Sequence, residues 1–223
     1  MNNKSFWDTC IALAFVFHIN SLHSISHMVF DSYPEHYWSE YVKDEYERRY
    51  DQKFKNLSRF FQDLNIDLEF PNKEFYSSKD LIQFAMENYS GKLKDDAKSS
   101  IKAFWEEYIG IQSQIPFYNL KSNIVDCLID LAHEKEVNNS ILKQELQLTP
   151  PRTDDYDDID SMLKSDGVKP EDCHVVLDGH DFAFKSNEPI DFITFDEKLY
   201  FSSKNIKILS FDSIKGKYDF KAS

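Results

Sequence analysis

The sequence has little of what marks the specialised protein classes. Its 223 residues include five glycines and seven prolines, too few for a collagen-like chain, a disordered chain or a turn-rich all-β fold. Its three cysteines, Cys10, Cys127 and Cys173, are scattered and odd in number, so they predict neither a disulfide framework nor a zinc motif. Free thiols suit a reducing compartment, and we therefore expect a cytoplasmic protein.

The chain also lacks an excess of positive charge and a long hydrophobic run. A formal charge of −13 at pH 7 excludes a protein that coats nucleic acid through surplus lysine and arginine. An acidic chain that handles nucleic acid has to recruit its positive charge as metal ions. The apolar run at residues 11–17 is well short of the ~20 residues that span a bilayer. It predicts a buried helix, with a signal peptide as the alternative, and no membrane partner.

What the chain does have is enough apolar material for one core and a helical pattern over most of its length. Hydrophobic residues make up 41% of the sequence and aromatic residues 15%, which suits a single decorated domain. Apolar spacing predicts a short strand at residues 4–7, followed by a series of helical segments. These segments are placed at residues 9–20, 21–31, 40–64 (one helix or two), 78–89, 95–109 and 120–136, with breaks at 91, 114–116 and 138–139.

The C-terminal third changes character. The aspartate-rich stretch 154–160 predicts a solvated linker and the charged start of a helix. A helix at 171–184 is then followed by two predicted strands, at 191–195 and 206–211. This pattern is typical of an α/β fold with a small parallel sheet flanked by helices.

The predicted elements also suggest how the chain is divided. Residues 1–50 and 166–223 form the predicted α/β core. Residues 51–165 form a large helical insertion that ends in the acidic linker.

Two aspartates stand directly after predicted strands. Asp8 follows the strand at 4–7, and Asp196 follows the strand at 191–195. In open α/β sheets, ligands bind outside the carboxyl ends of the strands. Glycine, asparagine or serine can end a strand without bringing negative charges together. Two acids at these positions therefore indicate a ligand site.

Two further acids are candidates for the same site. Asp172 lies in the first turn of the predicted helix 171–184, and Glu45 lies on the helix that begins after Ser39. Stabilisation by the helix dipole explains Asp172 equally well. Glu45 taken alone is one acid on a polar helix face.

A cluster of four carboxylates favours one kind of partner. Two like charges ~4 Å apart repel by ~4 kcal/mol at an effective dielectric of ~20. A divalent cation removes this conflict, and oxygen ligands without histidine or cysteine suit Mg²⁺ or Mn²⁺ better than Zn²⁺. The alternative is that each carboxylate is separately solvated or paired with a cationic side chain.

Four short motifs resemble those of the PIN-domain nucleases. Trp7-Asp8-Thr9-Cys10 resembles the family's opening LDTN, and residues 42–46 (VKDEY) resemble its V-x-x-E. Residues 172–179 (DCHVVLDG) resemble the helix that carries the third acid, and residues 192–196 (FITFD) closely resemble the F-v-T-x-D strand. The order along the chain also matches.

The resemblance implies a PIN-like core that hydrolyses RNA phosphodiester bonds as a metal-dependent endoribonuclease, leaving a 5′-phosphate and a 3′-hydroxyl. Asp8, Asp172 and Asp196 would ligate one or two Mg²⁺ or Mn²⁺ ions. Glu45 would complete that cluster or act as the base that takes a proton from the attacking water.

The resemblance also assigns supporting residues. Thr9 follows the first acid, and Thr194 stands where the family has serine or threonine beside the acidic cluster. Asp178 lies six residues after Asp172, on a different face of the helix, and is the weaker choice for the third acid. Cys10 replaces the asparagine that normally helps to hold the first carboxylate.

Partners follow from the same resemblance. The expected substrate is single-stranded or structured RNA, and an antitoxin, another protein or a second copy of the chain is an expected partner. The aromatic residues Tyr37, Trp38 and Tyr41 near Glu45 suggest base stacking, with core packing as the alternative. Two other functions remain open: a catalytically decayed PIN-like interaction protein, and a DNA nuclease.

Overall fold

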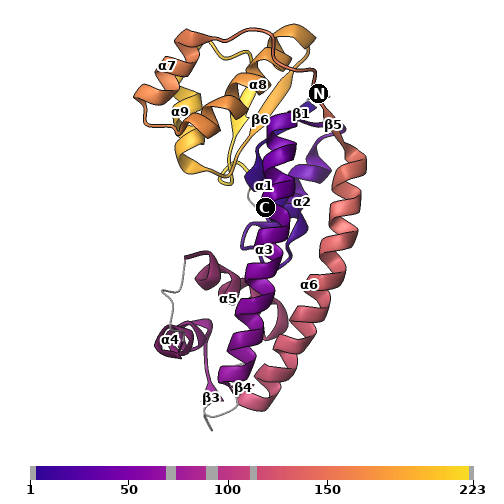
Figure 1. Ribbon diagram of the computed structural model, residues 1–223, viewed down its shortest axis with the longest axis vertical. Helices are drawn as coiled ribbons and strands as arrows, with labels where there is room; N and C mark the ends of the chain where they lie inside the picture. The colour runs from indigo at the N-terminus through magenta and orange to yellow at the C-terminus, as the bar shows by residue number, and fades with distance from the viewer. Residues whose placement is uncertain (1–3, 69–73, 89–94, 111–114, 221–223) are drawn as a thin grey trace. The chain divides into compact units, whose positions relative to one another are not determined.

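The computed structural model describes residues 4–68, 74–88, 95–110 and 115–220 (Figure 1). The chain forms two compact units. Unit 1 contains Met1–Phe15, Ser24–Arg49 and Ser140–Ser223, and unit 2 contains Val16–His23 and Tyr50–Asn139.

Unit 1 is an α/β unit with a five-stranded, fully parallel sheet in the order β5-β2-β1-β6-β7. The strands are β1 Lys4–Trp7, β2 His36–Trp38, β5 Leu146–Leu148, β6 Ile190–Ile193 and β7 Ser213–Lys215. Every residue of β6 is buried, and so are the last three residues of β1. Such near-continuous burial is expected for central strands that are covered on both faces.

The helices of unit 1 follow the strands in sequence. They are α1 Thr9–Val16, α2 His23–Ser32, the first part of α3 Glu40–Asp67, the last part of α6 Phe117–Glu145, α7 Asp157–Ser165, α8 Pro170–Ser186 and α9 Glu197–Asn205. Figure 1 shows α7 and α8 side by side, and the two helices are in contact. The N-cap of α3 is Ser39, whose hydroxyl accepts a hydrogen bond from Val42 N at 3.3 Å.

Helix α8 approaches the sheet closely because it carries a glycine at the contact. A Cβ added to Gly179 would lie 2.9 Å from ring atoms of both Phe6 and Phe211. Phe211 in turn stacks on Phe192 of β6, with ring centroids 5.0 Å apart. Any side chain at position 179 would push these rings apart. The close approach fixes the height of α8, and therefore of Asp172 at its start, above strands β1 and β6.

Unit 2 is largely helical. It contains the remainder of α3 and α6, helices α4 Ser78–Asn88 and α5 Asp95–Tyr108, and a short antiparallel pair formed by β3 Glu74–Phe75 and β4 Ile115–Pro116. Aromatic rings fill its interior: Phe61 contacts Phe104 with ring centroids 5.4 Å apart, and Phe75 contacts Phe84 at 5.5 Å. Among the described residues, no helix is both long and apolar enough to cross a membrane.

Several predicted elements are confirmed, and their ends differ in places. The strand at 4–7 is β1, and the helical pattern from 40 to 64 is one continuous helix, α3. The predicted helix at 9–20 ends earlier, at Val16. The predicted helix at 120–136 is longer and runs from Phe117 to Glu145 without a break at Asn138 and Asn139. Asparagine disfavours a helix by well under ~1 kcal/mol, so it does not end one that is otherwise supported.

The strand predicted at 206–211 is wrong. Those residues form turns, and the strand next to β6 is β7, which begins at Ser213. Phe211 of this stretch covers the sheet instead of joining it, and its ring stacks on Phe192. Two strands, β2 and β5, were not predicted, because three residues are too few to reveal a strand period.

The division of the chain also lies elsewhere than the sequence suggested. The predicted insertion covered residues 51–165, whereas unit 2 ends at Asn139. Residues 140–165 belong to unit 1 because β5 pairs with β2 and α7 packs against α8.

A buried aspartate in the sheet is neutralised by a network of donors. Asp191 of β6 is fully buried, and its carboxylate accepts from Tyr33 Oη at 2.7 Å and Ser213 Oγ at 2.7 Å. Lys215 Nζ lies 2.7 Å from the same carboxylate. Burial alone would raise the pKa of Asp191, but hydrogen bonds from Lys215, Ser213 and Tyr33 outweigh it and lower the pKa below its usual value. The network therefore fastens the edge strand β7 to β6.

We predict that Asp191→Asn destabilises unit 1 by about 2–4 kcal/mol near neutral pH, because it leaves Lys215 without its buried partner. The folded pKa of Asp191 is depressed, so its contribution is present above the unfolded pKa of ~3.9 and is lost as the pH falls through the lower folded value. Urea unfolding at a series of pH values measures the difference, which should shrink below about pH 4. The exposed Asp155→Asn is the control, and equal stability of Asp191→Asn and wild type near neutral pH would contradict the assignment.

Candidate functional site

The strand order of unit 1 defines where a ligand site is expected. From β1 the chain proceeds to β2 and β5 on one side, and then to β6 and β7 on the other. The order therefore reverses between β1 and β6. In open α/β sheets, the crevice at the carboxyl ends of the two strands at such a point is the usual ligand site. Asp8 directly follows β1 there, and its backbone N–H donates to Ile193 O, the last residue of β6, at 3.1 Å.

Asp8 is held by two hydrogen bonds to a single carboxylate oxygen. Thr194 Oγ1 donates to Asp8 Oδ2 at 2.8 Å, and Cys10 Sγ donates to the same oxygen at 2.8 Å. Asp8 is 7% exposed and Thr194 is fully buried. Among the described residues, no lysine or arginine forms an ion pair with Asp8. Burial raises the pKa of Asp8, the two hydrogen bonds oppose this, and the charges of Glu45 and Asp196 raise it further.

Cys10 links the two strand ends. Its sulfur donates to Asp8 and accepts a hydrogen bond from the backbone N–H of Phe195 at 3.1 Å. Burial, followed by the neighbouring Asp8 charge, raises the pKa of the Cys10 thiol well above its ordinary value. The thiol therefore stays protonated and acts as a donor at neutral pH. Cys10 thus holds the first carboxylate, as the asparagine of the resembling motif would.

Glu45 is brought to the same place by the residue after Asp8. Thr9 Oγ1 donates to Glu45 Oε2 at 2.6 Å. Arg49, one turn further along α3, forms an ion pair with Glu45 Oε1 at 3.0 Å. This spacing of four residues on a helix is typical of such pairs. Glu45 therefore lies beside the end of β1 with both of its oxygens in hydrogen bonds.

Asp196 caps the helix that follows β6. Its carboxylate accepts from Leu199 N at 2.8 Å at the start of α9, and its own N–H donates to Thr194 Oγ1 at 3.1 Å. One hydroxyl, that of Thr194, therefore contacts Asp8 through its proton and Asp196 through its oxygen. Asp196 has a structural reason to be acidic, since N-cap aspartate stabilises a helix, but its exposed carboxylate also faces the charge of Asp8.

Asp172 completes the group from the first turn of α8. Burial raises its pKa to about 6, and the charges of Asp8, Asp196 and Glu45 contribute, while Lys169 opposes them. The charges of the other acids therefore act on Asp8 and Asp172, although the four residues come from four separate segments. Asp8, Glu45, Asp172 and Asp196 are called the carboxylate cluster below.

Asp178 lies apart from the carboxylate cluster. Arg152 Nε is 3.3 Å from Asp178 Oδ1. Burial raises the pKa of Asp178, and Ser39 and Arg152 counteract this. Asp178 therefore fastens the segment after β5 and the start of α3 to α8. These contacts give Asp178 a structural role, and its expected role as a supporting acid of the site stays a prediction.

The aromatic residues near Glu45 divide into two groups. Tyr37 and Trp38 belong to β2 and are buried, so they pack in the core and do not offer faces for base stacking. Tyr41 is half-buried and lies against His174, with ring centroids 5.3 Å apart. Arg152 Nη2 is 3.3 Å from His174 Nδ1. Sequence reasoning missed Arg152, because a lone arginine after two prolines gives no signal of its partners.

The donor set of the carboxylate cluster is suited to a hard cation. It offers only carboxylate oxygen atoms, since the neighbouring Cys10 is a protonated thiol, and such sets favour Mg²⁺ or Mn²⁺. In the part of the chain that the structure describes, no group of three or more aspartate, glutamate, histidine or cysteine side chains is arranged to hold a metal ion. Comparisons of the chain with protein-family models, curated proteins and solved structures gave no match.

The contacts of Cys10 generate a first test of the site. We predict that Cys10→Ala lowers the free energy of unfolding by about 1–3 kcal/mol, because Asp8 Oδ2 loses one of its two donors and the Phe195 N–H loses its acceptor. Cys10→Ser keeps a donor and an acceptor at the position, so it should lose less than half as much. Urea unfolding followed by tryptophan fluorescence provides the measurement. Equal losses in the alanine and serine variants would show that the thiol only fills space.

The raised pKa of Asp172 generates a second test. Between the unfolded pKa of ~3.9 and the folded value of about 6, the folded state holds a proton that the unfolded state releases, so wild type loses stability as the pH rises. Asp172→Asn removes this penalty. We predict that it raises the free energy of unfolding by about 1–2 kcal/mol near neutral pH with EDTA present, and by nothing below about pH 4.

The matched control for this test is the exposed Asp44→Asn, which lies outside the carboxylate cluster. A pH-independent gain in Asp172→Asn, or the same gain in Asp44→Asn, would contradict the electrostatic origin of the penalty.

Proposed function

We propose that unit 1 is a Mg²⁺- or Mn²⁺-dependent endoribonuclease with a PIN-like fold that hydrolyses RNA phosphodiester bonds. The observation that carries this proposal is the convergence of Asp8, Glu45, Asp172 and Asp196 at the point where the strand order reverses. The five-stranded parallel sheet is compatible with such a fold. The choice of RNA rests on the resemblance of the four short motifs to PIN-domain nucleases.

Electrostatics supports a cation as the partner of the cluster. Asp191, the other buried aspartate of the central strands, is neutralised by Lys215. The carboxylate cluster has one cationic contact among the described ion pairs, that of Arg49 with Glu45. Asp8, Asp172, Asp196 and Glu45 are the residues that would hold the ions. A divalent ion bound there lowers the pKa of a water molecule and offsets charge that develops on the phosphodiester.

The side chains of this chain have separate tasks in the proposed reaction. Thr194 and Cys10 fix the orientation of Asp8 through its Oδ2 atom. Thr9 positions Glu45 through Oε2. Glu45 then either completes the ligand set or accepts a proton from the attacking water, since a carboxylate within reach of water is a suitable general base. Arg49 forms an ion pair with Glu45 in the free protein. In the proposed reaction, Arg49 binds a substrate phosphate instead.

A cleavage assay tests the proposal. The purified chain is incubated with end-labelled single-stranded RNA and with DNA of the same sequence, with Mn²⁺, Mg²⁺ or EDTA. We expect RNA fragments with 5′-phosphate ends only when a metal is added. Asp8→Asn and Asp196→Asn should each reduce the rate on the order of a hundredfold or more, because each removes a negative ligand. Asp44→Asn, next to Glu45 but outside the cluster, should retain the rate.

Metal binding is measured separately from cleavage. Millimolar Mn²⁺ should raise the thermal unfolding midpoint of wild type and of Asp44→Asn, and should not raise that of Asp8→Asn. A metal-dependent shift without cleavage of either nucleic acid would favour a decayed nuclease that serves as an interaction protein. Cleavage of DNA alone would reassign the substrate. Full RNA cleavage by Asp196→Asn would overturn the assignment of the site.

A further inference from the structure

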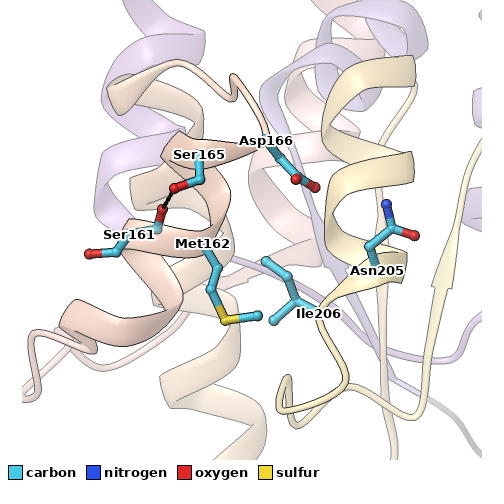
Figure 2. Close-up of a pocket in the computed structure, with 6 residues that line it drawn as sticks. All are labelled: Ser161, Met162, Ser165, Asp166, Asn205 and Ile206. Carbon is cyan, nitrogen blue, oxygen red and sulfur yellow. Dashed lines mark hydrogen bonds between the residues drawn. The ribbon is translucent and has the colours of Figure 1, made fainter.

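Two open hollows lie along α7 in unit 1, away from the carboxylate cluster. The first, of about 340 Å³, lies between the second half of α7 and the end of α9; Figure 2 shows Met162 and Ile206 facing each other across it. The second, of about 500 Å³, lies between the start of α7, α8 and residues Ile208 and Ser210. Both hollows share α7 and the segment 205–210 as walls, and together they are called the α7 groove.

The α7 groove is lined by apolar side chains that remain exposed. Phe184 is 65% exposed, Ile208 is 56% exposed and Met162 is 45% exposed. Ile159 and Ile206 form buried apolar surface beneath them. Met162 borders the first hollow, and Phe184 and Ile208 border the second. Large exposed apolar residues gathered on one part of a protein surface mark sites of interaction. Single exposed apolar residues, such as Phe201 on α9, are common and carry no such meaning.

The charged side chains that line the α7 groove are acidic. Asp157, Asp158 and Asp166 line it, and no lysine or arginine is among the described lining residues. Lys207 is exposed between the lining residues Ile206 and Ile208 and does not itself line the groove. None of the three aspartates forms an ion pair with lysine or arginine among the described residues. His180, which also lines the groove, accepts from Ser210 N at 3.0 Å, and burial lowers its pKa, so it adds no positive charge near neutral pH.

Helix stability explains only part of this acidity. Asp157 and Asp158 lie in the first turn of α7, where the helix dipole favours negative charge. Asp166 is the C-cap of the same helix, where the dipole disfavours a carboxylate. An exposed acid at the unfavourable end of the helix, beside an exposed apolar hollow, is therefore explained better by a partner than by the fold.

We propose that the α7 groove binds a peptide segment of another protein in which two apolar anchor side chains are flanked by lysine or arginine. The anchors occupy the two hollows, and the basic residues pair with Asp157, Asp158 and Asp166. Apolar anchors supply most of the affinity of such interfaces, and complementary charge at the rim supplies specificity and speed of association. The proposal is independent of the nuclease activity, since no residue of the carboxylate cluster lines the groove.

Selection from a displayed library of random peptides tests this proposal. The full chain is the bait, and the double variant Phe184→Ser with Ile208→Ser is used for counter-selection. We expect the peptides that survive to carry two apolar residues and an excess of lysine and arginine. Fluorescence anisotropy of a labelled survivor should show binding at least about tenfold weaker for the double variant. Phe201→Ser, which removes an exposed aromatic outside the lining, should bind as wild type does.

Charge is tested with the triple variant Asp157→Asn, Asp158→Asn and Asp166→Asn. It should bind the same peptide about tenfold more weakly at low salt and should lose most of the salt dependence seen with wild type. Asp126→Asn in unit 2 is the charge control. Survivors without a basic excess, survivors that bind the double variant equally well, or no survivors at all would overturn the proposal. Concentration-dependent dimerisation in sedimentation velocity that Phe184→Ser abolishes would also overturn it, and would assign the groove to a second copy of the chain.

Discussion

The hydrogen bonds from Thr194 and Cys10 to Asp8 are the constraint on which the rest of the site depends. They hold a buried carboxylate at the end of β1, and they do so from the chain that leaves β6 and from the first turn of α1. A buried charge without a cationic partner is unfavourable unless hydrogen bonds compensate it. Two donors to one oxygen compensate part of the cost, and no lysine or arginine among the described residues pairs with Asp8. The arrangement orients the acid without neutralising it.

The contrast with Asp191 shows that unit 1 contains two solutions to the same electrostatic problem. Asp191 lies in β6, and Asp8 directly follows the neighbouring strand β1. Both side chains are buried. Asp191 is paired with Lys215, and its pKa is lowered. Asp8 faces further carboxylates, and its pKa is raised. Stability alone explains the first arrangement, whereas the second raises the energy of the folded state, which is typical of residues retained for function.

The sequence was informative where local chemistry determines the outcome. The apolar run that ends at Asp8 predicts β1, and Pro170 followed by acids predicts the start of α8. The sequence was uninformative where a strand forms only because it pairs with a segment far away in the chain. Strands β2 and β5 have three residues each and exist because β1 and β2 offer free edges to them. The segment 206–211 has a strand-like composition, but Phe211 covers Phe192 and the ladder is made by Ser213–Lys215.

The candidate site shows the same limit. The four acids were identified from their positions after predicted strands and at predicted helices. The same reasoning left open whether Cys10 only fills space or forms hydrogen bonds. The structure decides this, because the Phe195 N–H donates to the Cys10 sulfur. Asp178 and Asp172 share a helix, and the partner of each is set by segments far away in the chain: Arg152 for one and the ends of β1 and β6 for the other. Motif spacing reports which residues have the right chemistry, and the three-dimensional contacts decide which of them act together.

A proton on Asp172 does not remove the repulsion that this residue experiences at neutral pH. Asp172 has a pKa of about 6, so near pH ~7 most molecules carry it ionised, beside Asp8, Glu45 and Asp196. Among the described ion pairs, the cluster has one arginine partner, Arg49, which contacts Glu45 Oε1. Helix stability alone explains Asp196 as the N-cap of α9 and Asp172 in the first turn of α8. It does not explain Asp8, because asparagine at position 8 would serve the fold equally well. The buried acid at position 8 is therefore the feature on which the proposal of a ligand site rests, since separate stabilising contacts do not require it.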